Sequence, residues 1–130
     1  MTVCKEGDTI QLQIFQQENS KVVFVESDDL LLTDVQSAIQ FISDIYEESS
    51  CSKIIIKKES IPEEFFDLKT KLAGEVLQKF VNYQTKLAIV GDFQSITSKS
   101  LHDFIYESNK GRDFFFVATI EEALARLHRW

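Results

Sequence analysis

Proline and glycine are scarce in this sequence. The 130 residues include one proline and four glycines, and no stretch is of low complexity. Long loops and flexible linkers are rich in these residues, so their scarcity predicts closely spaced helices and strands in a single domain over residues 1–130. A domain of this length can bury enough apolar surface to fold without a metal ion or a disulfide.

Cysteine and histidine are also rare, which limits the chemistry that the chain can support. The two cysteines, Cys4 and Cys51, lie far apart, and neither belongs to a CxxC motif. The two histidines, His102 and His128, have no cysteine or carboxylate at a metal-ligand spacing. We therefore expect no disulfide, no metal site and no cofactor, and we expect each thiol to be buried or unreactive.

Positive charge is in short supply as well. The chain has 14 Lys and Arg residues against 21 Asp and Glu residues, which gives a net charge of −7. This charge repels a phosphate backbone, so nucleic acid is not an expected partner. No apolar stretch approaches the length of a membrane span, and the first residues lack the features of a signal peptide. We expect a cytoplasmic protein that does not contact a membrane.

The sequence does contain a regular alternation of strand and helix patterns. The expected strands are 9–15, 21–25, 53–57, 86–90 and 113–118. The expected helices are 33–49, a short turn within 60–68, 68–84, a helix from Ser98 or Ser100 to Asn109–Gly111, and 119–130. The order ββαβαβαβα predicts an α/β fold with a mainly parallel sheet and an N-terminal antiparallel hairpin.

Short capping motifs predict where four of the helices begin. A Ser, Thr or Asp side chain can accept a hydrogen bond from the first turn of a helix, and a Glu or Gln three residues later completes a capping box. The predicted starts are the pairs Thr33 and Gln36, Ser60 and Glu63, and Thr119 and Glu122, and Asp67 for the helix over 68–84. A fifth helix has Ser98 or Ser100 as its expected cap.

Four of the expected strands, at 21–25, 53–57, 86–90 and 113–118, show no alternation with polar residues, which predicts that both faces of the sheet are covered. If all the helices follow same-handed crossovers, they cover one face only. A homodimer, or an unknown protein partner, would then cover the other face, with Phe115 and Trp130 as the expected contact residues. Helices on both faces of a monomer are the alternative.

A set of residues in the second half of the chain is typical of one known family. The set consists of Phe66, Asp67, Gly74, Glu75, Gln78, Lys79, Asn82, Tyr83, Gly91 and Asp92. From Phe65 to Leu127 the chain resembles the bacterial family catalogued as domain of unknown function 4180. The resemblance implies a small α/β fold, and the family has no assigned activity to carry over.

The element order also resembles the SpoIIAA-like, or STAS, fold. Its members act as phosphorylation-controlled partner switches or bind small anions and lipids. Their phosphoacceptor follows a strand, at a helix start, within an Asp-Phe-Ser-type motif. Ser60 follows the expected strand 53–57, but its neighbours Glu59 and Ile61 depart from that motif. We interpret Ser60 as a helix cap and keep phosphorylation of Ser60 as the alternative.

Gly91 and Asp92 follow an apolar strand, where parallel α/β sheets usually bind ligands. The simpler interpretation is that Asp92 hydrogen-bonds the turn that leaves the strand. The alternative is a site shared with the polar face of the helix over 68–84. Gly74 lies in the middle of that helix, where glycine costs about 1 kcal/mol relative to alanine, so we expect another group to pack closely against it.

No nucleophile elbow, P-loop, GxGxxG or HExxH motif occurs, so no catalytic residue is assigned. The sequence favours a non-catalytic regulatory or protein-interaction module. The alternative is a protein that binds a small molecule or an anion, or an enzyme, with polar residues around Asp92. The binding candidates for that alternative are Asp67, Glu75, Lys79, Asn82, Asp92, Asn109 and Arg112.

Overall fold

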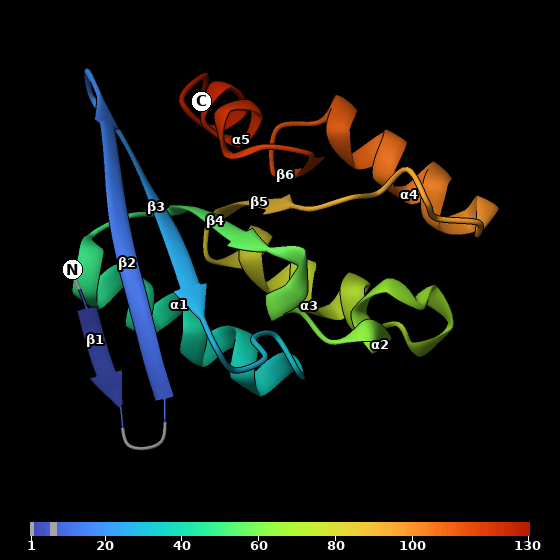
Figure 1. Cartoon of the computed structure of the whole chain (residues 1–130), viewed down its shortest axis with the longest axis horizontal. Helices are drawn as coiled ribbons and strands as arrows, with labels where there is room; N and C mark the ends of the chain where they lie inside the picture. Colours follow the sequence, from blue (N-terminus) through green and yellow to red (C-terminus); the bar gives the residue numbers. More distant parts are fainter. Residues whose placement is uncertain (1, 6–7) are drawn as a thin grey trace.

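The chain folds around one mixed β-sheet, in which the strands lie side by side in sequence order (Figure 1). The computed structural model describes residues 2–5 and 8–130, with side chains from Ile10 onward, so the side chain of Cys4 lies outside the described residues. The strands are β1 (Thr2–Lys5), β2 (Asp8–Gln17), β3 (Ser20–Ser27), β4 (Lys53–Lys57), β5 (Lys86–Val90) and β6 (Phe114–Val117).

The sheet confirms the predicted fold class. Strands β2 and β3 form the expected antiparallel hairpin, and β3, β4, β5 and β6 run parallel. Strand β1, antiparallel to β2, was not predicted. Its four residues are too few to show an alternation of apolar and polar side chains.

The helices cover both faces of the sheet. They are α1 (Val35–Ser49), α2 (Glu63–Phe66), α3 (Leu72–Asn82), α4 (Lys99–Lys110) and α5 (Ile120–Leu127), with short 3-10 turns η1 (Lys58–Ser60) and η2 (Leu68–Thr70). Helices α1 and α3 lie on one face and α5 on the other (Figure 1). Of the two arrangements considered, the structure has the alternative one, with helices on both faces, because α5 follows the last strand. It makes no crossover and is free to fold onto the opposite face.

Two apolar clusters fill the space between the sheet and these helices. Phe65 and Phe80 belong to the cluster under α1 and α3, whereas Phe115 and Leu127 belong to the cluster under α5. Phe115 is only 1% exposed and is therefore not available to a second copy of the chain. The buried free thiol of Cys51 agrees with the expectation for that residue. Homodimerisation stays a prediction.

Two of the predicted helix starts are confirmed and one is displaced by a single residue. Ser98 accepts a hydrogen bond from the Leu101 amide and Thr119 accepts one from the Glu122 amide. Helix α1 begins one residue later than predicted, with a capping box formed by Asp34 and Ser37, and the Ser37 amide lies 2.7 Å from Asp34 Oδ1.

The other two predicted starts are wrong. Ser60 caps no helix, because η1 ends at that residue and α2 begins after Pro62 without a side-chain cap. Asp67 caps η2 rather than α3, and its Oδ1 accepts a hydrogen bond from the Lys69 amide at 3.2 Å. Lys71 then takes a left-handed conformation with φ of 66°, which separates η2 from α3.

The prediction for Gly74 is also wrong. This glycine is exposed on α3, and a Cβ atom added to it would meet no heavy atom within 4 Å. We expect Gly74→Ala to raise the free energy of unfolding by about 0.5–1 kcal/mol, because alanine loses less backbone entropy when a helix forms. Urea denaturation of both proteins measures the difference. If Gly74→Ala is less stable than the wild type, another group must pack against Gly74, contrary to the structure.

Candidate functional site

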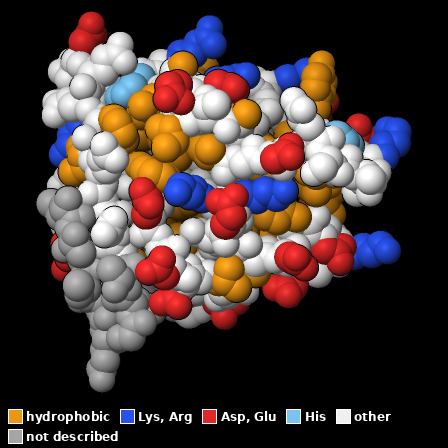
Figure 2. Space-filling model, in the orientation of Figure 1, with side chains coloured by type: hydrophobic (Ala, Val, Ile, Leu, Met, Phe, Trp, Pro, Cys, Tyr) orange, Lys and Arg blue, Asp and Glu red, His pale blue; other side chains and the backbone are white. Residues whose placement is uncertain are grey.

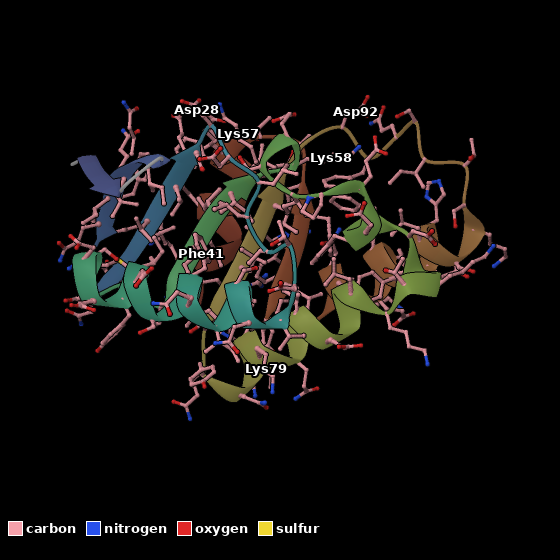
Figure 3. The ribbon with its side chains drawn as sticks, turned by 90° about the horizontal axis from the view of Figure 1, so that it is seen from below. Asp28, Phe41, Lys57, Lys58, Lys79 and Asp92 are labelled. Atoms are coloured by element: carbon pink, nitrogen blue, oxygen red, sulfur yellow. The ribbon has the colours of Figure 1, made fainter. Side chains whose placement is uncertain are left out.

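The carboxyl ends of the parallel strands bring several charged side chains to one edge of the sheet. Asp28 follows β3, Lys57 ends β4, Lys58 begins η1, and Asp92 follows β5. Figure 3 shows these four residues along the same edge. This is the edge at which parallel α/β sheets generally bind ligands.

Two shallow cavities open at this edge. The first, of about 410 Å³, is lined by Gln11, Glu26, Ser27, Asp28, Lys57, Glu59 and Ser60. The second, of about 550 Å³, is lined by Lys57, Glu59, Val90, Gly91, Asp92, Phe93, Gln94 and Ala118. Acidic and basic side chains alternate across this face in Figure 2, and Lys57 Nζ lies 3.7 Å from the Glu26 carboxylate. Neighbouring charges therefore offset one another, which weakens attraction for an anion.

The side chains of Asp92 and Lys58 both form hydrogen bonds with the backbone of the turn that follows β5. The Asp92 carboxylate accepts a hydrogen bond from the Gln94 amide at 2.9 Å, which is the simpler of the two roles considered for it. The Lys58 ammonium donates to the Asp92 carbonyl oxygen at 2.8 Å. It also lies 5.2 Å from the ring centroid of Phe93 and 5.8 Å from that of Phe66. These contacts occupy the ammonium group of Lys58, which packs directly against the Asp92 turn.

The polar residues of α3 do not reach Asp92. Because α3 connects two parallel strands, it runs back across the sheet, and its end lies at the opposite edge from Asp92. Figure 3 shows Lys79 on the side of the molecule away from Asp92. Neither Glu75, Lys79 nor Asn82 lines the cavity beside Asp92. Asn82 instead accepts a hydrogen bond from Gln78 at 3.0 Å.

The remaining candidates are also separate from Asp92. Asn109 and Arg112 lie before the start of β6, at the opposite edge of the sheet. The Asn109 side chain bonds to the backbone of Phe116, and the Arg112 guanidinium lies 5.7 Å from the ring centroid of Trp130. Ser60 is 6% exposed, and its hydroxyl donates to the Ser27 carbonyl at 3.3 Å. The structure thus distributes the predicted site residues over several places.

A groove that the sequence did not reveal lies between the ends of α1 and α3. It has a volume of about 870 Å³ and is lined by Ile39, Ile42, Ser43, Tyr46, Glu47, Ser50, Ser52, Tyr83, Gln84 and Thr85. Tyr46 is 59% exposed and Tyr83 is 53% exposed. The sequence feature that could have indicated this groove is a tyrosine near the end of each of two helices, Tyr46 in α1 and Tyr83 after α3. Tyr46 lies beside the apolar stripe of its helix. Its position fits the helical spacing of the buried residues, so the sequence pattern predicted a core residue there.

A second cluster that the sequence did not reveal joins α5 to the sheet. The Lys53 ammonium donates to Ser20 Oγ at 2.9 Å, and His128 Nδ1 lies 2.8 Å from the same oxygen. Burial and the nearby charge of Lys86 lower the pKa of Lys53. Burial and the nearby charge of Lys53 lower the pKa of His128. A neutral His128 can accept a hydrogen bond from the Ser20 hydroxyl, so the three side chains fasten the end of α5 to β3 and β4.

This cluster predicts a loss of stability on mild acidification. Because the folded protein lowers the pKa of His128, the unfolded chain binds more protons as the pH falls through the ordinary histidine value of about 6.5. Urea denaturation at about pH 7.5 and about pH 5.5 measures the effect. We expect His128→Gln to reduce the difference between the two conditions relative to the wild type. An equal difference in the wild type and in His128→Gln would show that His128 is not the cause.

Among the residues that the structure describes, no group of three or more His, Cys, Asp or Glu side chains is placed to hold a metal ion. Within the same residues, no helix combines the length and the apolar character required to cross a membrane.

The mixed sheet, with four helices toward one side and α5 on the other, defines a small α/β protein. The chain belongs to the family named Domain of unknown function (DUF4180), whose model matches residues 17–127. This match confirms the sequence-based assignment and extends it to β3, α1 and β4. No curated protein was found to match the sequence.

Proposed function

We propose that this protein is a non-catalytic cytoplasmic interaction module that binds a segment of a partner protein in the groove between α1 and α3. The exposure of Tyr46 and Tyr83 on the walls of that groove carries the proposal. Tyrosine offers a large apolar surface with a hydrogen-bonding group and few rotatable bonds, and it is enriched where proteins bind one another. The buried thiol of Cys51 suits a reducing compartment.

The alternative, an enzyme or a small-molecule or anion binder around Asp92, has less support. Catalysis requires several polar groups within reach of one reacting atom. The predicted site residues lie at opposite edges of the sheet, and contacts within the chain occupy Lys57 and Lys58. A phosphorylation switch at Ser60 would require η1 to open, because the hydroxyl is buried against Ser27.

Site-directed photo-crosslinking in cells of the source organism tests the proposal. A photoreactive amino acid at Ser43, in the groove, is expected to form a discrete adduct with a protein partner. The matched control carries the same amino acid at Glu121, an exposed position on α5 at the opposite face. The adduct from position 43 should disappear when Tyr83→Ala is added, because the partner loses one wall of the groove.

Two results would contradict the proposal. One is the absence of a groove-specific adduct, and the other is an adduct that is insensitive to Tyr83→Ala. If the adduct contains a second copy of this chain, light scattering should give twice the monomer mass of 15.0 kDa. That result would identify the predicted homodimer as the partner.

A further inference from the structure

We infer that the groove between α1 and α3 binds a cationic side chain, arginine or lysine, presented by a basic segment of the partner. This inference rests on the proposed function and names the chemistry that the groove recognises. It is carried by the charges on the groove walls, by the helix ends that meet there and by the two tyrosines.

The charged groups around the groove favour a cation. Glu47 lines the groove, and none of the described Lys, Arg or His residues does so. Glu47 and Glu48 occupy the last turn of α1, which contains no basic residue. Carboxylates are unfavourable at a helix C-terminus, because the backbone carbonyls there already carry partial negative charge. A bound cation would relieve this conflict between the sequence of α1 and its helix dipole.

A second helix end adds to the negative potential. Helix α3 ends beside the groove, where Tyr83, Gln84 and Thr85 follow its last residue. The C-terminal ends of α1 and α3 therefore meet at one place, and each carries the partial negative charge of a helix C-terminus. Helix α3 has a basic residue, Lys79, in its last turn, but Lys79 does not line the groove. Lys21 reaches the Ser49 carbonyl at 3.2 Å, and it too lies outside the lining residues.

The lysines that begin β4 and β5 interact with groups away from the groove. Lys53 donates to Ser20 beside α5, and Lys86 donates to the Arg112 carbonyl and to the Asp113 carboxylate. None of these partner residues lines the groove. Both ammonium groups are thus satisfied elsewhere, and the groove keeps an acidic and aromatic lining.

The tyrosines supply the faces on which a cation can stack. The ring quadrupole of tyrosine attracts an ammonium or a guanidinium group, and the planar guanidinium also stacks on the ring. The same pairing occurs within this chain, where Lys110 Nζ lies 4.5 Å from the ring centroid of Tyr106. Tyr46 and Tyr83 have no cation over their rings among the described residues, and both are more than half exposed. They therefore offer a place for the side chain of a partner.

Titration of the folded protein by NMR with two short peptides tests the inference. The probes are acetyl-Gly-Arg-Gly-amide and its citrulline counterpart, which has nearly the same shape and no charge. The arginine peptide is expected to shift the resonances of Tyr46 and Tyr83 saturably, and to bind at least about fivefold more tightly than the citrulline peptide.

Two variants with the same change in net charge separate local recognition from general attraction. Glu47→Gln removes the carboxylate of the groove, whereas Glu121→Gln removes an exposed carboxylate on the opposite face. We expect weaker binding only in Glu47→Gln. Absence of saturable shifts, equal binding of the two peptides or equal weakening in both variants would overturn the inference. Crosslinks that depend on Tyr83 without an arginine preference would leave the interaction module standing and reject only its cationic ligand.

Discussion

Replacing Asn109 by alanine is expected to lower the free energy of unfolding by about 2–4 kcal/mol. Strand β6 is the last strand of the sheet, and β5 pairs with only one of its edges. The Asn109 side chain pairs with the other edge. Its Nδ2 donates to the Phe116 carbonyl at 3.1 Å, and its Oδ1 accepts from the Phe116 amide at 2.7 Å. Phe116 is buried, so alanine would leave a donor and an acceptor without partners in an apolar environment.

Urea denaturation measures this loss, and hydrogen exchange locates it. The Phe116 amide should exchange faster in Asn109→Ala than in the wild type, because its hydrogen bond to the side chain is lost. Glu107→Ala is the matched control on the same helix, since the 3.7 Å ion pair of Glu107 with Lys110 is exposed and contributes little. A stability change within about 0.5 kcal/mol for Asn109→Ala would mean that water replaces both bonds.

Asn109 shows why sequence patterns located this residue but not its role. An asparagine followed by Lys110 and Gly111 at the end of an amphipathic helix is typical of a helix terminator, and α4 does end at Lys110. The Asn109 side-chain amide nevertheless makes the two backbone hydrogen bonds that a neighbouring strand would make with β6. That contact depends on how closely α4 packs beside the sheet, which helical periodicity does not determine. A ligand that used Asn109, one of the predicted binding candidates, would have to compete with these two backbone bonds.

The parallel part of the sheet was predictable because its strands are uniformly apolar. The runs at 54–56, 87–89 and 114–117 carry a strong signal, since strands buried on both faces contain few polar residues. The position of α5 was not predictable, because no later strand fixes the face on which it packs.

The burial of the last residues in the apolar stripe of α1 was also not predictable from spacing alone. Ile45 is buried while the adjacent Tyr46 is exposed, and both fit the apolar period.

The candidate site was predicted only in part. Asp92 lies at the carboxyl end of β5, as the strand and the following glycine indicated. Its true neighbours, Lys57, Lys58 and Glu59, come from β4 and η1. The sequence there suggested a capped helix starting at Ser60, so the 3-10 turn that positions Lys58 was missed. Groove residues from α1 and from the segment after α3 are distant in sequence, and only tertiary packing brings them together.

Gly91→Ala is expected to destabilise the protein by about 1–3 kcal/mol, in contrast to the gain expected for Gly74→Ala. A Cβ atom at Gly91 would lie 2.5 Å from Lys58 Cβ and 3.0 Å from Lys58 Cδ. The first of these atoms is fixed by the backbone of η1, so the side chain cannot simply rotate away. Lys58 would have to move, with loss of its hydrogen bond to the Asp92 carbonyl and of its contacts with Phe66 and Phe93.

A double-mutant cycle with Lys58→Gly separates this clash from a general effect of alanine at the end of β5. Each single variant is expected to lose stability, Gly91→Ala through the clash and Lys58→Gly through the missing contacts of the lysine. In the double variant no Lys58 side chain remains to meet the new Cβ, so its loss should be smaller than the sum of the two single losses. Urea denaturation of the four proteins gives the coupling free energy. Strictly additive losses would mean that Gly91 is required for some other reason than the close approach of Lys58.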